Sequence, residues 1–152
     1  MTLVEIIVVI FIISLFASIA FLNLPKIQGS FALSSAVYEL AQNIRTAENN
    51  ALTGVGKTSY VVSFDLSNPK QYSINGNSIN IDKTNAGILI KEFDDETGKI
   101  NNPVSITFTP PNPITTITGT SGSEVDIVLS LDSDPTQTKT VFVNTSGLIG
   151  VR

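Results

Sequence analysis

The feature that most constrains this chain is an apolar stretch close to its N-terminus. Residues 6–22 carry no charge, and their only polar side chains are those of Ser14 and Ser18. At about 1.5 Å per residue, the length of a helix over this stretch is close to the thickness of the hydrocarbon core of a bilayer, which is roughly 30 Å. We therefore predict a hydrophobic helix over residues 1–30, which must be covered either by lipid or by other copies of itself.

Glu5 is the exception within this helix. A carboxylate deep in hydrocarbon costs about 2.5–3.5 kcal/mol, so we expect Glu5 to be paired or functional. The first basic side chain is that of Lys26, which lies roughly 30 Å farther along a helix and cannot reach it. The nearest cation in sequence is the α-amino group of Met1, on the same chain or on a neighbouring copy.

A family resemblance rests on the first residues. They read Met1-Thr2-Leu3-Val4-Glu5, precede a run rich in Ile, Val, Phe and Ala, and resemble the mature N-terminus of type IV pilins and pseudopilins. The resemblance implies that prepilin peptidase removes a short leader, that the new amine of Met1 is N-methylated, and that Glu5 contacts the amine of an adjacent subunit. It thus assigns assembly to Met1, Thr2, Leu3 and Glu5.

Residues 31–152 are predicted to form a globular headpiece that begins with a second helical segment. Pro25 and Gly29 interrupt the apolar helix, and we predict a kink or a locally melted stretch there, with a simple membrane exit at Pro25 as the alternative. An amphipathic helix is predicted over residues 31–53, followed by Gly54. Its apolar stripe consists of Leu33, Val37, Leu40, Ile44, Ala47 and Ala51.

From residue 58 onward the apolar side chains recur at every second position, and this period predicts that residues 58–152 are rich in strands. Asn75-Gly76 suits the positive φ angles of a tight hairpin turn. Residues 112–123 are predicted as an exposed loop, with a short strand at 114–118 as the alternative. The other predicted strands are 59–65, 71–74, 78–82, 88–93, 104–109, 125–131, 140–144 and 148–151.

The fold class that follows is α+β. We expect a long N-terminal α-helix whose first half lies in a membrane or filament core and whose C-terminal half packs on an antiparallel β-sheet headpiece. The segments 38–51, 58–65 and 142–147 resemble the headpiece of H-type pseudopilins.

Composition removes several classes of active site. The chain contains no cysteine and no histidine, which excludes thiol nucleophiles, zinc–thiolate sites, Ser-His triads and histidine metal ligands. The basic residues are scattered singly along a chain of net charge −4, so we predict no dedicated nucleic-acid surface. We predict a protein that is not an enzyme and needs no cofactor.

Two acidic groups are candidate calcium sites. Asp132 and Asp134 lie two residues apart in a predicted loop, and Asp94, Asp95 and Glu96 form a second cluster. Since neither has the spacing of an EF-hand loop, solvated turns are the interpretation that we favour.

The predicted function is a structural subunit of a type IV pilus-like extracellular filament, a helical homo-oligomer. Before assembly, residues 1–30 would span the cytoplasmic membrane, with the headpiece outside and the pilus assembly machinery as partner. Two alternatives stay open. One is a minor pilin or pseudopilin of a type II secretion or DNA-uptake system, which the headpiece resemblance favours. The other is a monomeric membrane-anchored binding module.

Overall fold

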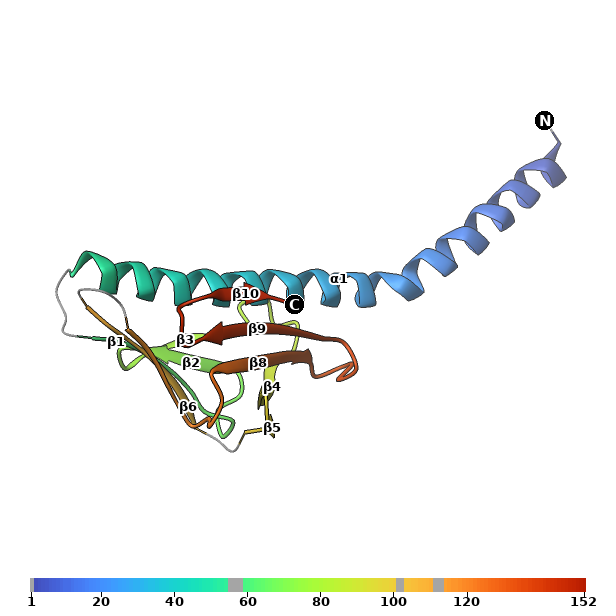
Figure 1. The fold of residues 1–152 in the computed structure, drawn as a ribbon. Coiled ribbons are helices and arrows are strands. Elements are labelled where there is room, and N and C mark those ends of the chain that lie inside the picture. The colour runs from blue at the N-terminus through green and yellow to red at the C-terminus, as the bar shows by residue number, and fades with distance from the viewer. Residues whose placement is uncertain (1, 55–58, 101–102, 111–113) are drawn as a thin grey trace. The chain divides into compact units, whose positions relative to one another are not determined.

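The computed structural model describes residues 2–54, 59–100, 103–110 and 114–152, without the side chains of residues 19–23. Within that range it is an α+β structure, as expected, with one long helix and strands in two antiparallel sheets (Figure 1). The chain divides into two compact units, Met1–Phe31 and Ala32–Arg152, and helix α1 contributes to both. The elements are α1 (Leu3–Thr53), β1 (Tyr60–Phe64), β2 (Gln71–Ile74), β3 (Asn77–Asn80), β4 (Ile88–Asp95), β5 (Gly98–Lys99), β6 (Val104–Thr109), β7 (Ile114–Thr118), β8 (Glu124–Leu131), β9 (Thr138–Asn144) and β10 (Ile149–Val151).

The first unit consists of the N-terminal part of α1. The helix continues through Pro25 and Gly29, so this stretch is not melted, whereas a kink there stays a prediction. Proline is tolerated inside a long helix at the loss of one backbone hydrogen bond. The helix ends at Thr53, and Gly54 follows in the left-handed conformation that commonly closes helices, with φ of 64°.

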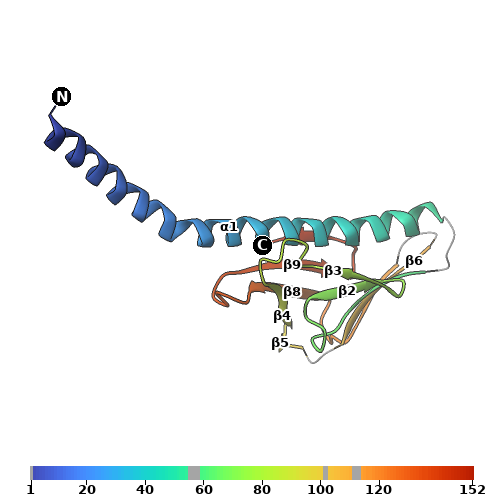
Figure 2. The ribbon, with the colours of Figure 1, turned by 180° about the vertical axis from the view of Figure 1, so that it is seen from behind.

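In the second unit, the predicted apolar stripe of α1 is buried. All six of its side chains are 2% exposed or less, and they belong to one hydrophobic cluster with residues of both sheets. Figures 1 and 2 show this part of α1 lying along the strands of its own unit from both sides. Polar contacts add to the packing: Asn43 Nδ2 donates to Tyr72 Oη at 2.6 Å, and Arg45 Nη2 donates to the carbonyl of Ile149 at 2.9 Å.

The strands form two five-stranded antiparallel sheets, so the expectation of one sheet is wrong. The first sheet has the order β3-β2-β1-β6-β7, and the second has the order β10-β9-β8-β4-β5. The chain leaves the first sheet after β3 through a loop that Asp82 fixes. Its buried carboxylate accepts hydrogen bonds from the amides of Ala86 and Gly87, and β4 then pairs with β8.

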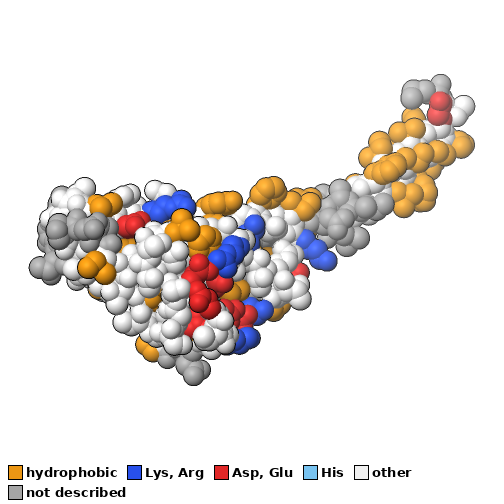
Figure 3. All heavy atoms as spheres, viewed as in Figure 1, with side chains coloured by type: hydrophobic (Ala, Val, Ile, Leu, Met, Phe, Trp, Pro, Cys, Tyr) orange, Lys and Arg blue, Asp and Glu red, His pale blue; other side chains and the backbone are white. Residues whose placement is uncertain are grey.

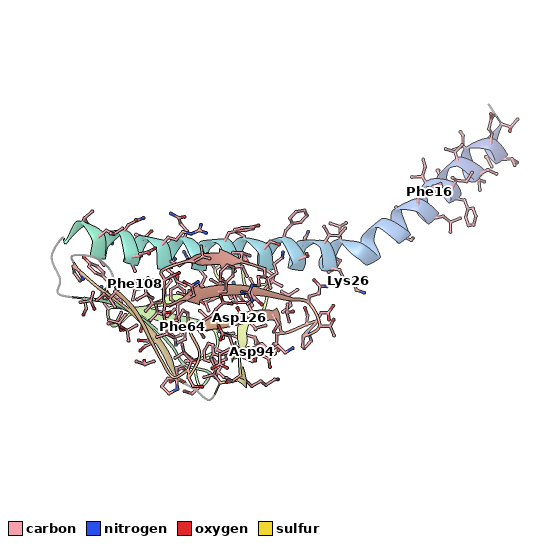
Figure 4. All side chains as sticks on the ribbon, viewed as in Figure 1. Phe16, Lys26, Phe64, Asp94, Phe108 and Asp126 are labelled. Atoms are coloured by element: carbon pink, nitrogen blue, oxygen red, sulfur yellow. The ribbon has the colours of Figure 1, made fainter. Side chains whose placement is uncertain are left out.

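The two sheets meet in an aromatic contact. Phe64 of β1 stacks on Tyr72 of β2 with ring centroids 5.8 Å apart. Phe64 and Phe93 of β4 pack edge to face with ring centroids 6.1 Å apart. Figure 4 labels Phe64 and Phe108, which are both fully buried on β1 and β6. The alternation of buried and half-buried side chains along these strands explains why the period-two pattern predicted them.

Local sequence signals agree with most strand ends. Asn75 and Gly76 have φ of 52° and 83°, which confirms the tight turn between β2 and β3. Residues 114–118 form β7, so the alternative to a loop holds there. The solvated turn that we favoured for Asp94, Asp95 and Glu96 is wrong in part, because Asp94 and Asp95 continue β4 and pair with β5.

Gly150 offers a test of the packing on the outer face of the second sheet. A methyl group at this position would lie 2.4 Å from Cε1 and Cζ of Phe142, so Gly150→Ala must displace the ring. We expect a loss of about 1–3 kcal/mol in the free energy of unfolding, measured by chemical denaturation. In a Phe142→Ala background the same substitution should cost much less, and an equal cost in both backgrounds would contradict this account.

Candidate assembly site

The first turn of α1 contains a reciprocal hydrogen-bond pair between Thr2 and Glu5. The amide of Thr2 donates to Oε2 of Glu5, and the amide of Glu5 donates to Oγ1 of Thr2, both at 3.4 Å. This arrangement is that of a capping box, and the amide of Glu5 also donates to the carbonyl of Thr2 at 3.1 Å. Sequence reasoning missed this role, although the spacing Thr-x-x-Glu is its signature.

The side chains that follow Glu5 are apolar and exposed on every side of the helix. Residues 6–13 are all apolar, and since successive residues advance by about 100°, they cover the full circumference. Exposure of the large apolar side chains between Leu3 and Phe16 ranges from 46% at Val9 and Ile12 to 76% at Leu3. Figure 3 shows these side chains, in orange, covering this end of the helix on the side in view.

The hydroxyl groups within this helix are satisfied by the helix itself. Ser14 Oγ donates to the carbonyl of Phe11, and Ser18 Oγ donates to the carbonyl of Ser14, each at 2.8 Å. A serine bonded in this way presents little polarity to its surroundings. This part of α1 is therefore suited to an apolar environment at its two serines as well as at its aliphatic positions.

The remaining residues predicted for this site are placed as follows. Met1, to which the resemblance assigns methylation and assembly, lies outside the described residues. Leu3 is exposed at the helix start, and Lys26, labelled in Figure 4, is exposed on the helix between Pro25 and Gly29. The structure thus brings Thr2 and Glu5 together.

The weak calcium candidates near Asp134 act as turn residues. The carboxylate of Asp134 accepts hydrogen bonds from the amide and hydroxyl of Thr136 and from Nε2 of Gln137. Asp132 donates its amide to the carbonyl of Gly87. Among the described residues, no group of three or more His, Cys, Asp or Glu side chains could hold a metal ion.

In the second acidic cluster, Asp95 ties the β4–β5 turn to the loop that follows β7. Its carboxylate accepts hydrogen bonds from Thr120 Oγ1 at 2.5 Å, and from the hydroxyl and amide of Thr97 at 2.5 and 2.7 Å. These bonds, with that from Thr120 the largest contribution, hold the pKa of Asp95 well below its ordinary value. Glu96 accepts a hydrogen bond from Ser123 Oγ at 2.7 Å.

A charged group on the outer face of the second sheet joins residues far apart in sequence. Arg152 forms an ion pair with Glu124 and donates to Oδ2 of Asp126 at 3.1 Å, while its guanidinium lies 4.4 Å from the centre of the Phe142 ring. Burial raises the pKa of Asp126, and Arg152 opposes this shift. Asp94, a cross-strand neighbour of Asp126, is labelled with it in Figure 4. No local spacing could have predicted this group.

The headpiece also has an open cavity of about 320 Å³ beside β1, β2 and β3. Its lining is mostly polar and consists of Ser63, Phe64, Asp65, Asn68, Gln71, Tyr72, Ser73, Ser78 and Pro103. Sequence reasoning missed it, because its residues come from separate strands and loops.

No family model, curated protein or solved structure matches this chain. Within the described part of the chain, no helix is both long enough and apolar enough to cross a membrane.

Asp95 gives a pH-dependent test of the headpiece. Because its pKa is lowered in the folded state, its contribution to stability is complete above the ordinary Asp pKa and is lost as pH falls below it. We expect Asp95→Asn to unfold at lower denaturant concentration than the wild type at pH 7, with the difference shrinking below about pH 4. Urea denaturation across this pH range measures the effect, and a difference that stays constant with pH would refute it.

Proposed function

We propose that this protein is the structural subunit of a type IV pilus-like extracellular filament, in which the N-terminal helices of many copies pack together as the core. The observation that carries the proposal is the uninterrupted apolar surface around residues 6–13. Burying one Leu, Ile or Phe side chain contributes about 1.5–3 kcal/mol, so a helix that is apolar all round is stable only when it is surrounded. In this proposal lipid of the cytoplasmic membrane surrounds it first, with the headpiece outside, and other copies replace the lipid on assembly.

The contacts of Glu5 favour neighbouring copies, rather than lipid, as the final surroundings of this helix. In one chain its carboxylate accepts the Thr2 amide at 3.4 Å, a long hydrogen bond that leaves acceptor capacity unused. A carboxylate buried in a bundle needs a cation, and an amine at the start of a neighbouring helix would supply one at the same depth. The pair would offset the desolvation of both charges and fix the axial position of one subunit against the next.

The test separates the charge of Glu5 from its capping role. Glu5→Gln keeps an acceptor for the Thr2 amide but has no charge, Glu5→Leu loses both, and Thr2→Ala removes the reciprocal hydroxyl but keeps the carboxylate. We expect both Glu5 variants to reduce filament yield by more than about tenfold, since breaking a buried ion pair costs about 3–5 kcal/mol. Thr2→Ala should assemble at near wild-type yield.

Sheared surface filaments would be counted by electron microscopy and quantified on a gel against the total amount of each variant. Mass spectrometry of the N-terminal peptide would check for methylation of Met1. A wild-type filament yield from Glu5→Leu would refute the role of Glu5 in assembly. A wild-type yield from Glu5→Gln, with a low yield from Glu5→Leu, would show that Glu5 acts only as a helix cap and that its charge is not needed.

A second candidate is the membrane-anchored binding module, which the polar cavity beside β1, β2 and β3 favours. Its hydroxyl, amide and carboxylate groups suit a small polar ligand. In that case the detergent-solubilised wild type would stay monomeric, and no filaments would be found on cells that produce it.

A further inference from the structure

Helix α1 carries one unpaired cation close to its apolar segment. Glu5 and Lys26 are the only charged side chains in residues 1–38. The other basic residue of α1 is Arg45, and its guanidinium donates to the carbonyl of Ile149. By contrast, neither Lys26 nor Glu5 forms an ion pair with a residue that the structure describes. One helix thus presents an acid and a base that its own described residues leave unmatched.

These two charges cannot meet within one chain. Both belong to the compact unit Met1–Phe31, through which the helix is continuous. They are 21 residues apart, which corresponds to about 31 Å along the helix and is far beyond the reach of a lysine side chain. An anion for Lys26 must therefore come from another molecule.

The surroundings of Lys26 restrict what this molecule is. Leu24, Ile27 and Phe31 are 42%, 54% and 72% exposed, so the apolar surface of the helix continues past the lysine. A free anion would match the charge but leave these side chains in water, so the partner must combine an anion with an apolar surface. Residues 5–13 of a second copy have this composition. Lipid with an anionic headgroup has it too, and in the proposed function lipid precedes the second copy.

One axial offset matches the charges and the apolar surfaces together. When two parallel copies are displaced by about 31 Å, Lys26 of one copy lies at the level of Glu5 of the other. The exposed Ile27 and Phe31 then lie at the level of residues 6–10, which are all apolar. Packed helices have axes about 8–10 Å apart, and glutamate and lysine side chains form ion pairs across such a contact.

We propose that Lys26 pairs with Glu5 of a second, parallel copy that is displaced by about 31 Å along the helix axis. The first copy then keeps its own Glu5 open, and the second keeps its Lys26 open, so a third copy adds through the same contact. Such a heterologous contact with an axial displacement extends without closing into a ring. Glu5 has enough acceptor sites for Lys26 and for the amine of a nearer copy.

This inference rests on the proposed filament, and it adds the axial register and a second cation for Glu5. An antiparallel pair of helices would also bring Glu5 and Lys26 together, twice in one dimer. That pair is isologous and closed, so it cannot extend. A filament whose subunits all point the same way uses the parallel arrangement.

The absence of cysteine from the chain allows the register to be measured by cross-linking. Val9 and Ser30 lie one helical turn after Glu5 and Lys26 on the same faces, so they face each other between displaced copies. A chain with Val9→Cys and Ser30→Cys forms this disulfide only between copies, because the two positions are about 31 Å apart within one chain. The matched control combines Phe16→Cys with Ser30→Cys, since Phe16 lies on the face of Val9 about 10 Å farther along the helix.

Sheared filaments of the full chain would be oxidised with copper–phenanthroline, which accepts the electrons of the two thiols. We expect Val9→Cys with Ser30→Cys to form trimers and longer chains at least about tenfold faster than Phe16→Cys with Ser30→Cys. Equal rates in intact filaments would overturn the register and leave the proposed filament standing. Rapid dimers from the Phe16→Cys control would indicate the antiparallel pair and overturn the proposal. Absence of filaments from cells that produce the wild type would overturn both proposals.

A second measurement tests the charge of Lys26 without cysteine. Lys26→Gln removes the cation, and Lys26→Arg is the matched control that keeps it. We expect Lys26→Gln to lower filament yield at least about fivefold at an unchanged amount of membrane-bound subunit, and Lys26→Arg to assemble at near wild-type yield. A wild-type yield from Lys26→Gln would contradict the pairing.

Discussion

The contact between α1 and the two sheets is the interaction on which the headpiece depends. Each sheet has one apolar face, and an apolar face is stable in water only when another element covers it. The stripe from Leu33 to Ala51 belongs to the same buried cluster as the inner faces of both sheets. Without the helix, the inner faces of both sheets in that cluster would be exposed to water.

Features set by neighbours in sequence could be predicted. The bounds of β2 and β6 agree with the predicted ranges, and those of β7 agree with the alternative to the predicted loop. The stripe of α1 was identified from its spacing, because all of these depend on the periodicity of a short segment. The division into two sheets could not be predicted in this way. It depends on β4 pairing with β8, and the hydrogen bonds of Asp82 that direct β4 there are visible only once the loop is folded.

The same distinction applies to the candidate sites. Glu5 was found from sequence because a lone carboxylate in an apolar run is unusual, and its cap with Thr2 was available from the same few residues. Arg152 and Asp126 are 26 residues apart, and the cavity draws on several strands, so no local pattern could have revealed either. The cap that Glu5 forms with Thr2 is compatible with its proposed pairing, since a carboxylate that caps its own helix retains acceptor sites for another donor.

The burial of the stripe along one helix also determines how the headpiece responds to mechanical load. A pull along α1 at Ala32 would act parallel to the surface on which Leu33, Val37, Leu40, Ile44, Ala47 and Ala51 pack, so these contacts would share the tension and yield together rather than one after another. Resistance to force is set by the rate of unfolding, and a shared, simultaneous rupture keeps that rate low. A helix buried in this way is a strong attachment point for a domain that is held only by its N-terminal end.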